Sequence, residues 1–184
     1  MSRRTEITQA LIAQFNQISI ANGYNTDLGV RGRVQRPVAD SQQGAVLPFG
    51  LLTVPREDKS DEVVSNYFAC TMTVELAVAP ASAEDGFVEE DVEQIVEDCE
   101  RVILAIKAQE PPLNINGVID IDYTGHEKLP LRGDLVFCGA VLNMRVEYRH
   151  DVDDPRTYIG LGESTPSAPA VAPPVIDGAP VIVS

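Results

Sequence analysis

Two segments that alternate apolar and other residues with a period of two constrain the fold more than any other feature of the sequence. Such alternation places every second side chain on the same face of an extended strand. Each segment therefore predicts a long strand with one buried face, and Pro80 closes the first. The apolar faces comprise Phe68, Cys70, Met72, Val74, Leu76 and Val78 in the first segment, and Val136, Cys138, Ala140, Leu142, Met144, Val146 and Tyr148 in the second.

Two further segments repeat apolar residues at helical spacing. The first predicts an amphipathic helix over residues 5–21, with Thr5 as its N-cap and Asn22-Gly23 as its stop. The second runs from Val88 to Ile106, carries acids in its first turns and ends before Pro111-Pro112. Both helices need an apolar sheet face to cover.

The remaining segments predict shorter strands. Residues 30–34 alternate valine with arginine and suggest a half-exposed edge strand. A second strand is expected over Val46 to Val54, followed by a charged loop from Glu57 to Glu62. Ile119, Ile121 and Tyr123 alternate with two aspartates in a further strand, before a segment rich in turn residues.

This order of elements predicts an α/β (α+β) protein. We expect an antiparallel or mixed sheet of four to five strands with two helices packed on one face and a polar second face for partners. Residues 1–154 form the domain. After Asp154 the sequence turns to Pro, Ala, Ser and Gly, so residues 155–184 are expected to form a flexible, extended or disordered arm.

The charge of the chain disfavours nucleic-acid binding. Twenty-eight acidic against fourteen basic residues give a formal net charge of −14, whereas affinity for DNA comes largely from Lys and Arg on phosphates. Ten acids lie in residues 84–110, and five arginines against three acids lie in residues 1–40. This asymmetry suits a contact between subunits, although a solvated acidic helix face accounts for the same acids.

Other features exclude whole classes of protein. The longest apolar run, 135–142, is far shorter than the roughly 20 residues that cross a bilayer, and the first residues lack a continuous apolar signal region. We expect no membrane contact. Cys70, Cys99 and Cys138 are widely spaced among apolar neighbours, which predicts reduced core residues of a protein that folds in the cytosol.

Few residues suggest chemistry. Asp120 and Asp122 lie two apart on a predicted strand, so they project to one side and could share a divalent cation, but a half-exposed strand gives the same pattern. His150 is followed by three aspartates within four residues, where a solvated loop is the simpler interpretation. No nucleophile elbow or phosphate loop is present, so we expect no enzyme, no cofactor and no metal.

The opening helix that runs into ANGYNTDLG (residues 21–29), the order of the elements and the ending VEYRHDVDDP (residues 146–155) resemble the tail terminator proteins of tailed bacteriophages. The resemblance covers about residues 5–150. It implies a small α/β subunit of a hexameric ring that caps the tail tube and joins it to the head-neck connector. Such a protein belongs to the virion, at the tail or neck, and assembles in the host cytoplasm.

A ring leads to three hypotheses about residues. Subunit contacts would use Arg31, Arg33 and Arg36 against a neighbour's acids, and Val181, Ile182 and Val183 of the arm as a strand added to an exposed sheet edge. The channel lining would be acidic and would let DNA pass without binding. Its expected members are Glu57, Asp58, Asp61, Glu62, Glu89, Glu90 and Glu93.

Two alternatives remain open. A head-closure or tail-tube protein of the same virion would place the ring one level higher or lower. A small metal-dependent enzyme would use Asp120, Asp122 and His150.

Overall fold

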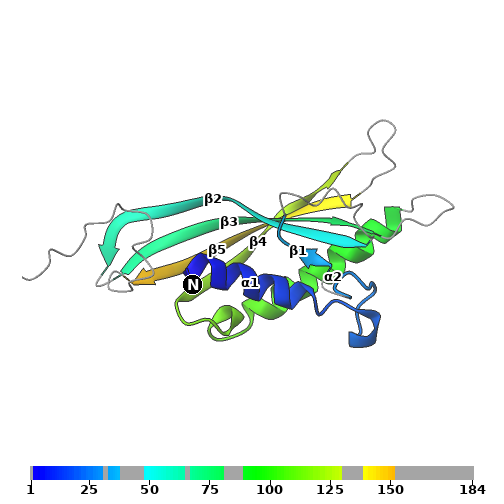
Figure 1. Ribbon diagram of the computed structural model, residues 1–184, viewed down its shortest axis with the longest axis horizontal. Helices are drawn as coiled ribbons and strands as arrows, with labels where there is room; N and C mark the ends of the chain where they lie inside the picture. The colour runs from blue at the N-terminus through cyan, green and yellow to red at the C-terminus, as the bar shows by residue number, and fades with distance from the viewer. Residues whose placement is uncertain are drawn as a thin grey trace, which may run out of the picture.

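The computed structural model describes residues 2–30, 33–37, 48–64, 67–80, 89–129 and 139–151, and structural statements below refer to these. Two α-helices, two short 3-10 turns and five strands follow one another along the chain (Figure 1). They are α1 (Arg3–Phe15), η1 (Ile20–Asn22), β1 (Val34–Gln35), β2 (Phe49–Val64), β3 (Tyr67–Ala79), α2 (Glu89–Lys107), η2 (Pro112–Asn114), β4 (Val118–Leu129) and β5 (Gly139–Asp151).

The five strands form one mixed sheet in the order β1-β2-β3-β5-β4. Only the β1–β2 pair is parallel, and the other three pairs are antiparallel. Both helices lie on one face of this sheet (Figure 1). The predicted fold class is confirmed, and β3 is the central strand as expected.

The two apolar rows found in the sequence lie side by side in the sheet. β3 and β5 pair from Tyr67 opposite Asp151 to Val78 opposite Ala140. Residues opposite each other in an antiparallel pair share a face, so the rows merge into one apolar floor. The described part of both rows is buried from Cys70 to Val78 and from Ala140 to Tyr148.

The helices cover this floor with their apolar stripes. Burial of each large aliphatic side chain contributes about 1.5–3 kcal/mol. Cys70 and Cys99 are free, buried thiols, as predicted, and burial raises the pKa of both, while Cys138 lies outside the described residues. The stripes comprise Ile7, Leu11 and Phe15 of α1 and Val92, Ile95, Val96, Cys99, Val102, Ile103 and Ile106 of α2.

The first helix is shorter and starts earlier than the sequence suggested. Ser2, not Thr5, is the N-cap, because its hydroxyl accepts a hydrogen bond from the Thr5 amide at 3.2 Å. The helix ends at Phe15 because the Asn16 side chain pairs with β1, donating to the Val34 carbonyl at 2.9 Å and accepting from the Val34 amide at 3.0 Å. Ile18 therefore reaches the core from outside the helix.

The predicted loop from Glu57 to Glu62 is instead part of β2. This stretch pairs with β3, with Glu57 opposite Met72 and Lys59 opposite Cys70. The run of charged residues had indicated a loop, but the strand leaves Glu57, Asp58 and Lys59 exposed, and β1 flanks β2 only at Gly50 and Leu51. Charges are compatible with a strand that is open to water on one edge.

The fourth strand also departs from simple alternation. A bulge between Val118 and Asp120 turns Val118 into the core and leaves Ile119 44% exposed, whereas the sequence pattern had placed Ile119 beside Ile121. A bulge re-aims the side chains on one side of it. A second irregularity at Gly125, which has a φ of +122°, lets the strand continue to Leu129 where a turn was expected.

The ANGYNTDLG segment is fixed to α2 by one buried carboxylate. Asp98 is 0% exposed and accepts hydrogen bonds from the Asn25 amide at 3.0 Å and from the amide and hydroxyl of Thr26 at 2.8 Å each. Arg101 lies 3.6 Å from Asp98 and donates to the Gly23 carbonyl at 3.2 Å. The segment can therefore fold back over the end of α1.

Replacing Asp98 with Ala should destabilise the fold by about 3 kcal/mol, because three donors lose their acceptor in a buried place. Asp98→Asn, which keeps one acceptor oxygen, should cost less. The exposed neighbour Glu97→Ala is the control and should change the free energy of unfolding by less than about 0.5 kcal/mol. Urea unfolding measures all three, and equal costs for Asp98→Ala and Glu97→Ala would refute the role given to Asp98.

Candidate assembly surface

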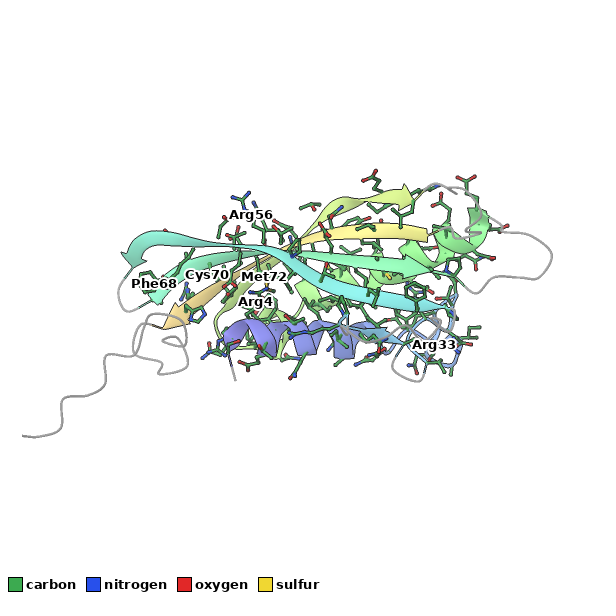
Figure 2. The ribbon with its side chains drawn as sticks, turned by 45° about the horizontal axis from the view of Figure 1, so that its top comes forward. Arg4, Arg33, Arg56, Phe68, Cys70 and Met72 are labelled. Atoms are coloured by element: carbon green, nitrogen blue, oxygen red, sulfur yellow. The ribbon has the colours of Figure 1, made fainter. Side chains whose placement is uncertain are left out.

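The sheet face opposite the helices carries charged rows that run across the strands. Register places Arg56, Thr73, Arg145 and Asp122 in one row, from β2 to β4. The next row comprises Asp58, Thr71, Glu147 and Asp120. Arg56 points away from the helices in Figure 2. We call this side of the four strands the outer face.

Ion pairs link the two rows of the outer face. Arg56 Nε lies 2.7 Å from Asp58 Oδ2. Arg145 lies 3.1 Å from Asp122 and 3.4 Å from Glu147. Because these side chains are exposed or only partly buried, the pairs add little stability. They do order the charges into a fixed pattern that a partner can meet.

Asp120 and Asp122 share a cation, but this cation belongs to the protein. Lys107, at the end of α2, places Nζ 2.5 Å from Asp122 and 3.4 Å from Asp120. Hydrogen bonds from Lys107 and Arg145 hold the pKa of Asp122 below its usual range, and the Asp122 hydrogen bond raises the pKa of Lys107. The two carboxylates do lie together, as the sequence suggested.

His150 does not join this pair. His150 is two residues along β5 from the buried Tyr148, so both side chains lie on the helix-covered face of the sheet. Their ring centroids are 5.6 Å apart. Asp120 and Asp122 pair in register with Glu147 and Arg145 of the outer face. Within the described ranges, no three His, Cys, Asp or Glu side chains form a group suited to a metal ion.

Carboxylates of α2 connect this helix to the edge strand β4 along its length. Lys128 of β4 binds Glu89 at 2.8 Å and also Glu93, and both acids raise the Lys128 pKa. Glu100 lies 3.7 Å from His126, whose Nδ1 is 2.7 Å from the Tyr123 hydroxyl. We call this side of the molecule, formed by β4 and the adjoining face of α2, the acidic margin.

The acids expected to line a channel are distributed over three places. Glu57 faces the helix side, where it accepts a hydrogen bond from the buried Tyr148 and lies 3.4 Å from Arg4. Asp58 lies on the outer face, and Glu89, Glu90 and Glu93 lie on α2. Asp61 and Glu62 belong to β2, but their side chains lie outside the description. Sequence patterns missed the link from Glu57 to Tyr148, since it joins residues far apart in the chain.

The arginines expected at a subunit interface also lie in different places. Arg33 lines a hollow of about 420 Å³ together with Asp27 and with Asp91 of its own α2. Arg36 is exposed and lines a different hollow with Arg4. Arg31 and the arm residues Val181, Ile182 and Val183 lie outside the described residues.

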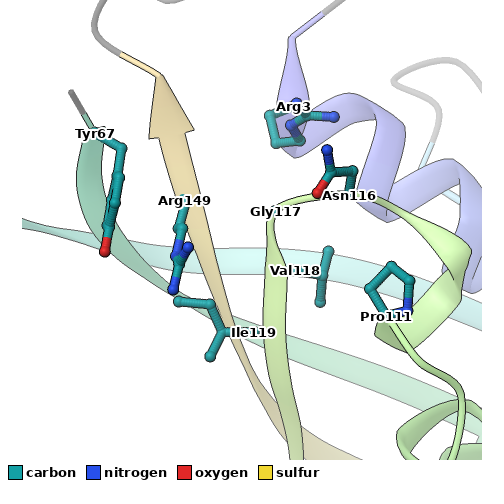
Figure 3. Close-up of a pocket in the computed structure, with 8 residues that line it drawn as sticks. All are labelled: Arg3, Tyr67, Pro111, Asn116, Gly117, Val118, Ile119 and Arg149. Atoms are coloured by element: carbon teal, nitrogen blue, oxygen red, sulfur yellow. The ribbon is translucent and has the colours of Figure 1, made fainter. Parts of the chain in front are cut away.

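A third hollow, of about 330 Å³, lies where β5 passes the start of β4 (Figure 3). Arg149 stacks on Tyr67 with its guanidinium carbon 4.5 Å from the ring centroid. The Arg149 amide donates to the Gly117 carbonyl at 2.7 Å, and Arg3 lines the other side. Arg3 is already paired with Glu6 at 2.9 Å, so its charge is compensated within the chain.

Comparison of the sequence with protein-family models and with curated proteins gave no match. Among the described helices, none is both long and apolar enough to cross a membrane.

Substituting Asp120 and Asp122 together with Asn should leave fold and assembly nearly intact, because exposed strand carboxylates contribute little. The lowered pKa of Asp122 sets the sign of the pH dependence. Its stabilisation is present above the carboxyl pKa of the unfolded chain and is lost as pH falls through the folded pKa. The small difference in melting temperature between wild type and variant should thus vanish in acid.

Thermal unfolding at neutral and acid pH measures that difference. A variant that loses a bound divalent cation, or that no longer assembles at neutral pH, would show that the aspartate pair has more than a surface role.

Proposed function

We propose that this chain is a structural virion protein of the tail terminator type. Its copies form a ring of six, which caps the tail tube and joins it to the head-neck connector protein. The observation that carries the proposal is the outer face, a sheet surface from β2 to β4 that the two helices leave open and that bears an arginine row beside an acid row.

Such a face suits contact with another folded protein. Most outer-face residues of β3 are small, such as Thr71, Thr73 and Ala77, so a partner surface can approach this strand closely. Ordered rows of opposite charge favour one register and disfavour others.

The overall charge fits passage of DNA. Six copies carry 6 × −14 = −84 formal charges. An acidic channel repels phosphates, whereas a basic one would hold them by counterion release. Within the proposal, the channel acids are Glu90 of α2 with Asp61 and Glu62 of β2. The other acids expected there already have partners, because Glu57 is bound to Tyr148 and Arg4, Asp58 pairs with Arg56, and Glu89 and Glu93 bind Lys128.

The rival assignments differ in what supports them. A head-closure or tail-tube protein would use the same outer face one level higher or lower in the particle. An enzyme built on Asp120, Asp122 and His150 finds less support, because His150 lies across the sheet from the two aspartates.

The proposal is tested by producing phage particles without this protein. Tails should then lack their terminating ring, and heads and tails should accumulate separately, because nothing caps the tube or meets the neck. Electron microscopy of the particles, with the protein supplied in trans as the control, gives the readout. Normal particles formed without the protein would rule the function out.

A chain that stops after Asp154 should fold normally, because the sheet and both helices lie before that residue. We expect it to join heads to tails less efficiently, since the arm would be missing. β1 pairs over only two residues, so the edge that receives Val181, Ile182 and Val183 would lie elsewhere on a neighbour or on the neck protein.

Circular dichroism and particle yield measure the two effects of truncation separately. Full yield from the shortened chain would leave the arm without an assembly role, and a shortened chain that does not fold would shift the domain boundary beyond Asp154.

A further inference from the structure

We infer that copies of this chain associate head to tail, with the acidic margin of one copy seated in a basic groove on the opposite edge of the next. This deepens the proposed function by naming the contact between ring subunits. The contact itself rests on charges and edges of the described fold, so it can be tested without any particle.

The basic groove lies between the first turns of α1 and the strand β2. Its volume is about 460 Å³, and Ser2, Arg4, Thr5, Thr8, Arg36, Pro37, Leu52, Thr53 and Val54 line it. These described lining residues include two arginines and no acid. The Arg4 side chain is 47% exposed, and Arg36 is exposed without an ion-pair partner within the described residues. In a chain of net charge −14, such a groove suits a carboxylate-bearing partner.

The edge of β2 beside this groove is built for side-chain contact and not for strand addition. β1 flanks only Gly50 and Leu51, so the rest of β2 has no neighbour there among the described strands. Pro55 lacks an amide donor, and Arg4 occupies the Val54 carbonyl at 3.2 Å. Proline and charge on an edge strand oppose backbone pairing.

The acidic margin lies at the other end of the strand order. β4 is the last strand in this order, and contacts of Lys128, His126 and Lys107 hold α2 beside it. The margin carries six carboxylates against three cations, because Arg145 of the adjoining β5 pairs with Asp122. They are Glu89, Glu93, Glu100, Asp120, Asp122 and Glu127 with Lys107, Lys128 and Arg145. Its excess of acid is opposite in sign to the charge of Arg36 in the groove, where Arg4 is paired with Glu57.

The positions of the groove and the margin determine the symmetry of the contact between copies. A groove on one sheet edge and a complementary margin on the opposite edge give a heterologous contact, which leaves each new copy with the same two surfaces and closes into a ring when the rotation allows. Contacts of groove with groove, or of margin with margin, would bring like charges together and are disfavoured.

The test uses charge reversal at each surface. Arg36→Glu alters the groove but keeps the internal pair of Arg4 and Glu57, and Glu93→Lys/Glu100→Lys alters the margin. Each variant alone should associate roughly tenfold more weakly than wild type or worse. The chain that carries all three substitutions should regain association, because its groove and margin are again opposite in sign.

The matched control is Arg56→Glu, which makes the same charge change at an exposed arginine of the outer face. Native mass spectrometry and sedimentation velocity at low and high salt give the readout. Wild type and Arg56→Glu should form oligomers that weaken as salt screens the contact.

Three results would overturn the inference. The first is a wild-type chain that stays monomeric at its highest soluble concentration in low salt, and the second is a combined variant that fails to regain association. The third is a loss of association with Arg56→Glu but not with Arg36→Glu. The last would place self-contact on the outer face. Normal particles formed without the protein, beside confirmed oligomers, would refute the tail function and leave the contact standing.

Discussion

The pairing of β3 with β5 is the constraint on which the rest of the structure depends. Twelve residue pairs, from Tyr67 with Asp151 to Val78 with Ala140, run without a bulge. Because the side-chain period is two, a slip of one residue between β3 and β5 would turn the apolar row of one strand to the outer face. The uninterrupted register therefore fixes which face the helices cover and which face stays outside. The bulges fall in β2 and β4, where the sheet meets solvent and α2.

Features that repeat along the chain could be predicted from the sequence. The alternation of β3 and β5 predicted the central strands, and the apolar stripe from Val92 to Ile106 predicted α2 to within a residue or two of its ends. These patterns are local, and packing reinforces them. The uncovered polar face followed from the same alternation, because a strand with one apolar face must present the other to water.

Features that depend on distant partners could not be predicted in this way. Asp98 was one more acid in an acidic helix, although its place within the buried stripe was a signal that it has internal donors. The end of α1 depends on Asn16 meeting β1, and the strand character of Glu57 depends on Met72 and Tyr148. Charge pattern alone could not separate Arg33, which lines a hollow together with its own Asp91, from Arg36 at the groove.

The charges of this chain therefore have different physical roles according to how deeply each side chain is buried. Asp98 is buried with its donors and acts on the stability of the fold. Arg56, Arg145 and the acids beside them are exposed and neutralise one another, so they set a pattern and add little energy. On the groove, Arg36 leaves an excess of positive charge, and on the margin Glu89, Glu93, Glu100 and Glu127 outnumber Lys128. Since opposite excesses on opposite edges of one rigid sheet are satisfied between copies and not within one, association is the process that these charges are placed to control.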